Sequence, residues 1–184
     1  HDAIHSGGGS CGPNATAPCD DHGHGTHTMG TMVGDDGLGN QVGMAPGARS
    51  IGCRNMDVGV GTATTHTDCF QWFIAPTDLG NQNPDPAMAP DSINNSWGCP
   101  TSEGCNPGNF AVMQQVVENV RAAGIFVAVS AGNDGSSCSS VKRKIRVKAS
   151  CAMRAATRCN SGDTDCARVS AAGTKALLPP SLII

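Results

Sequence analysis

His24-Gly25-Thr26-His27-Thr28-Met29-Gly30 follows directly after Asp20-Asp21-His22-Gly23 and is the most informative stretch of the chain. The glycines on either side of His24 leave room for another backbone to approach its ring closely. The small residues from Gly25 to Val33 predict a helix that begins beside this histidine. The spacings H-x-H and H-x-x-H both occur here, so a metal cluster of His22, His24 and His27 is the alternative to one reactive histidine.

Two later segments favour the reactive histidine. Asn94-Asn95-Ser96-Trp97-Gly98 comes first, and Val127-Ala128-Val129-Ser130-Ala131-Gly132-Asn133-Asp134-Gly135 follows it. Together with the H-G-T-H run, they resemble three motifs of the subtilases, the subtilisin-like serine peptidases. The resemblance implies that His24 is the general base of a catalytic triad. It also implies that the Ser96-Trp97-Gly98 backbone pairs with the substrate, and that the Asn133 amide donates to the developing oxyanion.

The other two triad members are not found by their motifs. In subtilases the triad runs Asp, His, Ser along the chain, with the Asp in D-[TS]-G and the Ser in G-T-S-M-A. Neither form of the first motif precedes His24, and no G-T-S occurs anywhere. Asp20 and Asp21 lie very close to His24 in the sequence, so we expect them to open its helix instead. The chain starts with His1 rather than Met, and we therefore expect an internal piece of a longer protein.

Charge divides the chain at residue 141. Residues 1–141 hold 3 Lys and Arg against 13 Asp and Glu, whereas residues 142–184 hold 9 against 2. No Gly, Ser or Pro linker precedes Lys142, and the break falls inside what the family builds as continuous core. We therefore predict a partial subtilase catalytic domain over 1–141 and a divergent or out-of-frame basic tail over 142–184. The alternative is a basic appendage that binds nucleic acid or a membrane surface. Residues 168–174 within this stretch resemble a later V-S-A-P-G-T turn of the family.

Ten cysteines among 184 residues indicate an oxidising compartment, and so a secreted, extracellular protein. Cys11 with Cys19 and Cys99 with Cys105 are spaced to close small local disulfide loops. Sequence assigns no partner to the remaining cysteines before the tail, which are Cys53, Cys69 and Cys138. No C-x-x-C pair supports a zinc site. No apolar run of 18 residues occurs, so we expect no membrane span.

The predicted elements alternate as they do in α/β folds. Helices are expected over residues 25–33, 67–74 and 110–123, and strands over 48–54, 91–96 and 125–129. The last two strands and the helix between them predict a right-handed βαβ unit, and the apolar run 125–129 predicts a parallel strand buried on both faces. By the resemblance, the fold is an incomplete three-layer subtilisin-like α/β fold with a mainly parallel sheet. Ser96 and Asn133 then follow the carboxyl ends of strands, where such sheets place their sites.

The function implied is that of a serine endopeptidase of the subtilisin type, most similar to the bacillopeptidase F-like branch. We expect polypeptide substrates, a monomer, no nucleic-acid or membrane partner, and no required cofactor. Asp35-Asp36-Gly37 with Asn40 is either a calcium site or an acidic surface turn. Without the triad Asp and Ser, this chain alone should be inactive. The alternatives are an inactive subtilase-like module that binds peptides along residues 94–98, and a basic-tailed binding protein.

Overall fold

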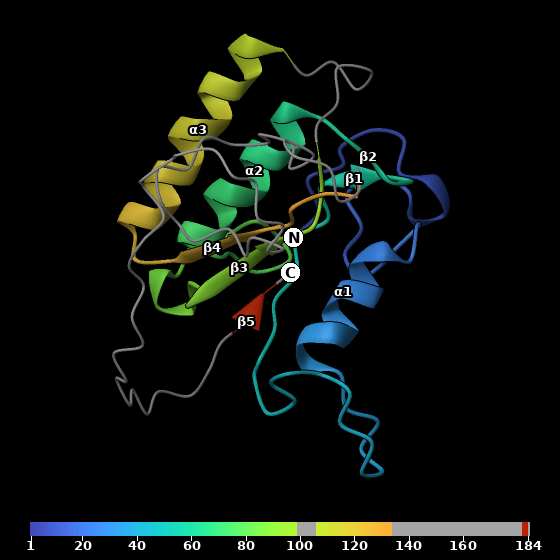
Figure 1. The fold of residues 1–184 in the computed structure, drawn as a ribbon. Helices are drawn as coiled ribbons and strands as arrows, with labels where there is room; N and C mark the ends of the chain where they lie inside the picture. The colour runs from blue at the N-terminus through green and yellow to red at the C-terminus, as the bar shows by residue number, and fades with distance from the viewer. Residues whose placement is uncertain (99–105, 134–181, 184) are drawn as a thin grey trace, which may run out of the picture.

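The computed structural model describes residues 1–98, 106–133 and 182–183 (Figure 1). A parallel sheet, a small hairpin and three α-helices make up most of its regular structure. In chain order the elements are η1 (Gly9–Cys11), α1 (His24–Val33), β1 (Met56–Asp57), β2 (Val60–Gly61), α2 (Ala63–Ile74), η2 (Pro86–Met88), β3 (Ser92–Asn95), α3 (Pro107–Ala122), β4 (Phe126–Val129) and β5 (Leu182–Ile183). The chain therefore has the expected α/β fold, with an incomplete sheet.

The parallel sheet has three strands, with β3 between β4 and β5. Ser92 of β3 pairs with Phe126 of β4, and the register runs to Asn95 opposite Val129. The expected strand–helix–strand unit is confirmed, because α3 connects β3 to its parallel neighbour β4. β1 and β2 form a separate antiparallel hairpin.

The core lies between the sheet and helices α2 and α3, which run side by side over it (Figure 1). Ile93 and Val127 are register partners on adjacent strands and both are buried, so this face of the sheet is covered. The helices contribute the other main core side chains: Cys69, Phe70 and Phe73 from α2, and Met113, Val116, Val117 and Val120 from α3. Their spacing of three and four residues places them on one face of each helix.

The prediction that residues 125–129 are buried on both faces is wrong for β4. Phe126 is 57% exposed, whereas Val127 beside it is 3% exposed. Successive side chains of a strand point to opposite faces, so Phe126 lies on the face of the sheet that α2 and α3 do not cover.

The strand expected over residues 48–54 is also not formed as such. Arg54 makes an isolated parallel bridge with Asp2, held by hydrogen bonds from Ala3 N to Arg54 O and from Arg54 N to His1 O, both 3.0 Å. The bridge is not extended into a ladder. The Ile4 amide donates to the Asp2 carboxylate at 2.9 Å, so the chain turns after Asp2 instead of continuing as a strand.

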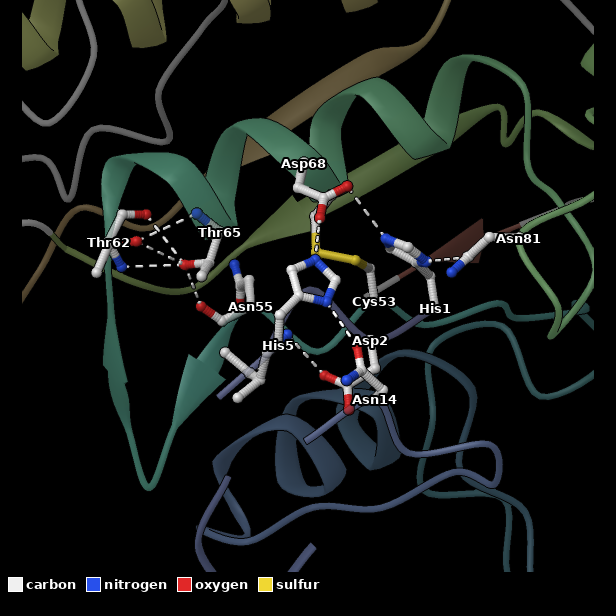
Figure 2. Close-up of polar contacts among 12 residues, drawn as sticks. His1, Asp2, His5, Asn14, Cys53, Asn55, Thr62, Thr65, Asp68 and Asn81 are labelled. Carbon is white, nitrogen blue, oxygen red and sulfur yellow. Dashed lines mark hydrogen bonds and ion pairs between the residues drawn. A yellow bond between two sulfur atoms is a disulfide. The ribbon is translucent and has the colours of Figure 1, made fainter. Parts of the chain in front are cut away.

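Side-chain caps set the starts of two helices. α2 begins four residues before its predicted start, because Thr62 and Thr65 form a capping box just ahead of it (Figure 2). Asn106 caps α3 by accepting from the amides of Gly108 and Asn109, at 2.9 and 3.2 Å. Proline at the first position of α3 is compatible with this start, because that amide has no helical partner. The first helix matches its predicted range to within one residue.

Two disulfides lie within the described residues. Cys11 and Cys19 are paired with Cα atoms 5.9 Å apart, which confirms the predicted local loop. Cys53 is bonded to Cys69 of α2, with Cα atoms 5.7 Å apart, a pairing that sequence left unassigned. The predicted pair Cys99–Cys105 lies outside the described residues. No helix in the described ranges is long and apolar enough to cross a membrane.

Candidate active site

A cavity of about 740 Å³ opens between the start of α1, the side of α2 and the end of β3. His24 lines it from α1, and Ser96, Trp97 and Gly98 line it from the segment after β3. The fold thus brings together two motifs that are far apart in the sequence. Asn133 is exposed and follows β4, the strand next to β3, but is not among the lining residues.

His24 is the first residue of α1, and its side chain is exposed. Gly23 precedes it with φ of 83°, a left-handed conformation that glycine adopts without steric cost. The ring of His22 lies edge-on to that of His24, with centroids 6.4 Å apart. No group of three or more His, Cys, Asp or Glu in the described part of the chain is arranged to hold a metal. The metal-cluster alternative at residues 22, 24 and 27 therefore has no structural support.

Asp20 caps the helix that carries His24, as the sequence predicted. Its carboxylate accepts from the amides of His22, Gly23 and Thr26 at 2.7–3.0 Å, and from the Thr26 hydroxyl at 2.6 Å. Partial burial acts to raise the pKa of Asp20, but the hydrogen bonds from Thr26, His22 and Gly23 outweigh it and lower the pKa well below its usual value. The ionised carboxylate therefore stabilises the start of α1.

Replacing Asp20 by Ala is expected to cost about 1–2 kcal/mol of folding stability at pH 7 through loss of the cap. Because the pKa of the folded state is lowered, this contribution is present above the unfolded value of about 4 and is lost as pH falls below it. Urea unfolding of the wild-type chain and the variant at several pH values measures the difference. Asp20→Asn is the matched control, since its amide oxygen still accepts but does not titrate. An Asp20→Ala penalty that persists unchanged at low pH would contradict the ionic cap.

Asp21 does not open the helix, contrary to expectation, but is held by Arg54. The Arg54 guanidinium bonds Asp21 at 2.6 Å and Asp2 at 3.0 Å, and these side chains are at most 10% exposed. It also donates to the carbonyls of Gly12 and Gly8, at 2.9 and 2.8 Å. Burial acts to lower the pKa of Arg54, but Asp21 and Asp2 raise it overall. One side chain thus ties three segments together at the wall of the cavity, which Arg54, Asp2 and Asp21 all line.

His1, which also lines the cavity, and His5 join the first residues of the chain to α2. Their Nε2 atoms lie 3.1 Å from the two carboxylate oxygens of Asp68 (Figure 2). The hydrogen bond to Asn14, and then that to Asp68, raise the pKa of His5. The contact is structural support for the segment that carries Asp2.

The segment after β3 is held by a short chain of side-chain hydrogen bonds. Trp97 Nε1 donates to Asn95 Oδ1 at 3.1 Å, and Asn95 Nδ2 donates to the carbonyl of Ala128 in β4 at 3.1 Å. Asn94 Nδ2 donates to Ser96 Oγ at 2.8 Å. The two asparagines therefore position the predicted substrate-binding segment, a role that sequence reasoning missed although they adjoin Ser96-Trp97-Gly98.

In the turn that is the candidate calcium site, the carboxylates of Asp35 and Asp36 accept hydrogen bonds from amides of the same turn. Asp35 accepts from the amide of Gly37 at 2.8 Å. Asp36 accepts from the amides of Leu38 and Asn40, at 2.8 and 3.0 Å, and these bonds lower its pKa. These contacts are those of an exposed acidic turn.

Comparison with known proteins identifies the family. The model of the subtilase family matches residues 9–175, which includes most of the stretch after residue 141. The chain belongs to the subtilase family. It is 42% identical to bacillopeptidase F of Bacillus subtilis (strain 168) over 118 residues, 64% of this chain and 8% of that protein. It is 31% identical to subtilisin E of the same strain over 132 residues, 71% of this chain and 30% of that protein.

Subtilisin of Bacillus pumilus is 30% identical over 132 residues, 71% of this chain and 42% of that protein. The chain therefore spans less than half the length of each of these relatives. No solved structure matches it significantly. Within the subtilase family, the cavity lined by His24 and by Ser96-Trp97-Gly98 is the candidate active site.

Proposed function

We propose that this subtilase chain is part of a serine endopeptidase in which His24 is the general base. The observation that carries the proposal is that His24 and the Ser96-Trp97-Gly98 segment line one cavity although they come from distant parts of the sequence. A base must lie within reach of the bound peptide, and an exposed ring at the edge of a cavity satisfies that need.

The proposed reaction is acyl transfer to a serine. The serine hydroxyl attacks the peptide carbonyl, His24 accepts its proton, and an aspartate orients the His24 ring. Asn133 is proposed to stabilise the oxyanion with its amide. Support for this role comes from its position after β4, since Ser130 N donates to Asn95 O at 3.0 Å and so joins the ends of β4 and β3.

The proposed substrates are polypeptides bound in extended form along Ser96-Trp97-Gly98. The 42% identity to bacillopeptidase F supports assignment to that branch. The two disulfides support an extracellular protein, because such bonds persist in oxidising compartments. We propose a monomer that requires no cofactor, with the acidic turn at Asp35 as the place where calcium binding is to be measured. We also propose that residues 1–141 are a partial catalytic domain and that residues 142–184 are a divergent or out-of-frame basic tail.

The second candidate is an inactive subtilase-like module that binds peptides along residues 94–98, a segment whose side-chain hydrogen bonds to β4 hold it at the cavity with or without a triad. Both candidates require peptide binding in the cavity. In both, the isolated chain lacks the nucleophile.

We therefore expect the purified chain to bind blocked peptides but to form no covalent adduct with a serine-directed fluorophosphonate probe. Isothermal titration calorimetry measures binding, and gel fluorescence measures labelling, with intact subtilisin E as the positive control for the probe. Labelling of the chain would show that it contains a reactive serine and would refute the prediction that the nucleophile is missing. Failure to bind any peptide would refute peptide recognition.

A further inference from the structure

Asn95, the last residue of β3, is a buried polar residue that the proposed reaction does not use. It is 6% exposed and lies directly before the Ser96-Trp97-Gly98 segment. Its carboxamide lies between two partners. Oδ1 accepts from Trp97 Nε1 at 3.1 Å, and Nδ2 donates to the carbonyl oxygen of Ala128 in β4, also at 3.1 Å. These bonds offset the cost of burying the amide.

The two partners require a side chain that both donates and accepts. The indole N–H of Trp97 can only donate, and the carbonyl oxygen of Ala128 can only accept. The carboxamide of Asn95 offers one oxygen and one NH₂ group, so these partners set its orientation. An ionised aspartate has no hydrogen to donate to Ala128, and a leucine of similar shape makes neither bond. The contacts therefore favour a carboxamide at this position.

Asn95 also contacts β4 through its backbone. It is the register partner of Val129, and its carbonyl accepts from Ser130 N at 3.0 Å. The bonds to Ala128 and Ser130 thus lie one residue before and one residue after that partner. Both residues shortly precede Asn133, the proposed oxyanion donor. One residue of β3 therefore contacts the predicted substrate-binding segment and also the strand that leads to Asn133.

We propose that Asn95 is a positioning residue that couples the Ser96-Trp97-Gly98 segment to Asn133. The inference rests on the proposed function, because it assumes that Asn133 stabilises the oxyanion. An oxyanion donor acts only when it is held at the place where charge develops on the bound peptide. That place is set by the segment that pairs with the peptide, so the segment and Asn133 must keep a constant separation. Loss of the Asn95 carboxamide lets the segment and the end of β4 shift relative to each other.

The first test measures the bond to Trp97 in the full 184-residue chain. Trp72 and Trp97 are its two tryptophans, so their indole N–H groups give two signals in a nitrogen-15 spectrum. The Trp97 indole hydrogen should exchange with solvent about tenfold more slowly in the wild-type chain than in Asn95→Leu. Trp72 Nε1 donates to Thr77 Oγ1 at 3.0 Å, so Thr77→Val is the matched control and should speed exchange at Trp72 alone. A wild-type Trp97 hydrogen that exchanges as fast as that of a free indole would overturn the inference without any variant.

The second test measures the coupling to Asn133. It uses a chimera in which this chain replaces the aligned segment of bacillopeptidase F and the relative supplies the missing triad members. Asn95→Leu should lower kcat about tenfold when Asn133 is present, and less than about twofold in the Asn133→Leu background. A residue that acts through Asn133 loses its effect once Asn133 is removed, whereas general destabilisation lowers kcat equally in both backgrounds. Asn119→Leu is the matched control and should leave kcat unchanged, because Asn119 is exposed on α3 and does not line the cavity.

Asn95→Asp separates the two bonds of the carboxamide. It keeps an oxygen for Trp97 but has no donor for Ala128, so it should keep slow exchange at Trp97 and still lower kcat. It replaces Asn95→Leu in the kinetic comparison if that variant does not fold. Equal losses of kcat in both backgrounds would overturn the inference and leave the role of Asn133 intact. An unmutated chimera without activity would count against the proposed function itself, and the inference would fail with it.

Discussion

Replacing His24 by Ala is expected to lower kcat by about 10⁶ in an enzyme completed with the missing triad members, a value measured for the base of a subtilisin and carried over here. Such an enzyme is a chimera of bacillopeptidase F in which this chain replaces the aligned segment, 42% identical over 118 residues. The relative then supplies the Asp and Ser that the family resemblance places outside the segment. Without His24, the serine proton has no acceptor, and both acylation and deacylation lose their proton transfer.

Hydrolysis of a chromogenic peptide and labelling by a fluorophosphonate probe measure the effect. His27→Ala in the same chimera is the control and should keep its activity, because this exposed side chain lies outside the cavity. Asn133→Leu should lower kcat by about 10²–10³ without preventing labelling, again by analogy with a subtilisin. A His24→Ala chimera that retains activity would exclude His24 as the base. An unmutated chimera that folds but is not labelled would favour the inactive peptide-binding module.

Sequence predicted best the parts of the fold that depend on local pattern. Helix α3 was marked by apolar residues recurring every three or four positions, and the start of α1 by the glycines and carboxylates around His24. The strands on either side of α3 were apolar or β-forming runs of the right length, and their parallel pairing followed from the helix between them. These features need no knowledge of distant contacts.

Sequence failed where distant contacts decide the structure. The pairing of Cys53 with Cys69 depends on how the loop before β1 docks on α2, and nothing in the spacing marks it. Asn95 reads as one more polar residue at the end of a strand, and only its bonds to Trp97 and to β4 distinguish it. The start of α2 was the exception, because Thr62 and Thr65 are a capping signal that could have been found.

Arg54 is the clearest case of a residue whose importance no motif reveals. It lies between Asp2 and Asp21, and each of the three side chains is at most 10% exposed. Asp2 also accepts from the amides of Ile4 and Ala15, at 2.9 and 2.7 Å, so it retains partners without Arg54. Among the described residues, Asp21 forms its ion pair with Arg54. Asp21 directly follows Asp20, which caps the helix that carries His24.

Arg54→Met is therefore expected to cost about 3–5 kcal/mol of folding stability, because it leaves buried carboxylate charge without its partner. Urea unfolding followed by circular dichroism measures the loss, and Arg49→Met is the matched control. Arg49 is exposed, so its replacement should change stability by less than about 0.5 kcal/mol. Adding Asp21→Asn to Arg54→Met should recover part of the loss, since the unpaired charge is then removed. If Arg54→Met is no more destabilising than Arg49→Met, the buried network contributes nothing to holding the start of α1, and the position of His24 must depend on the Asp20 cap alone.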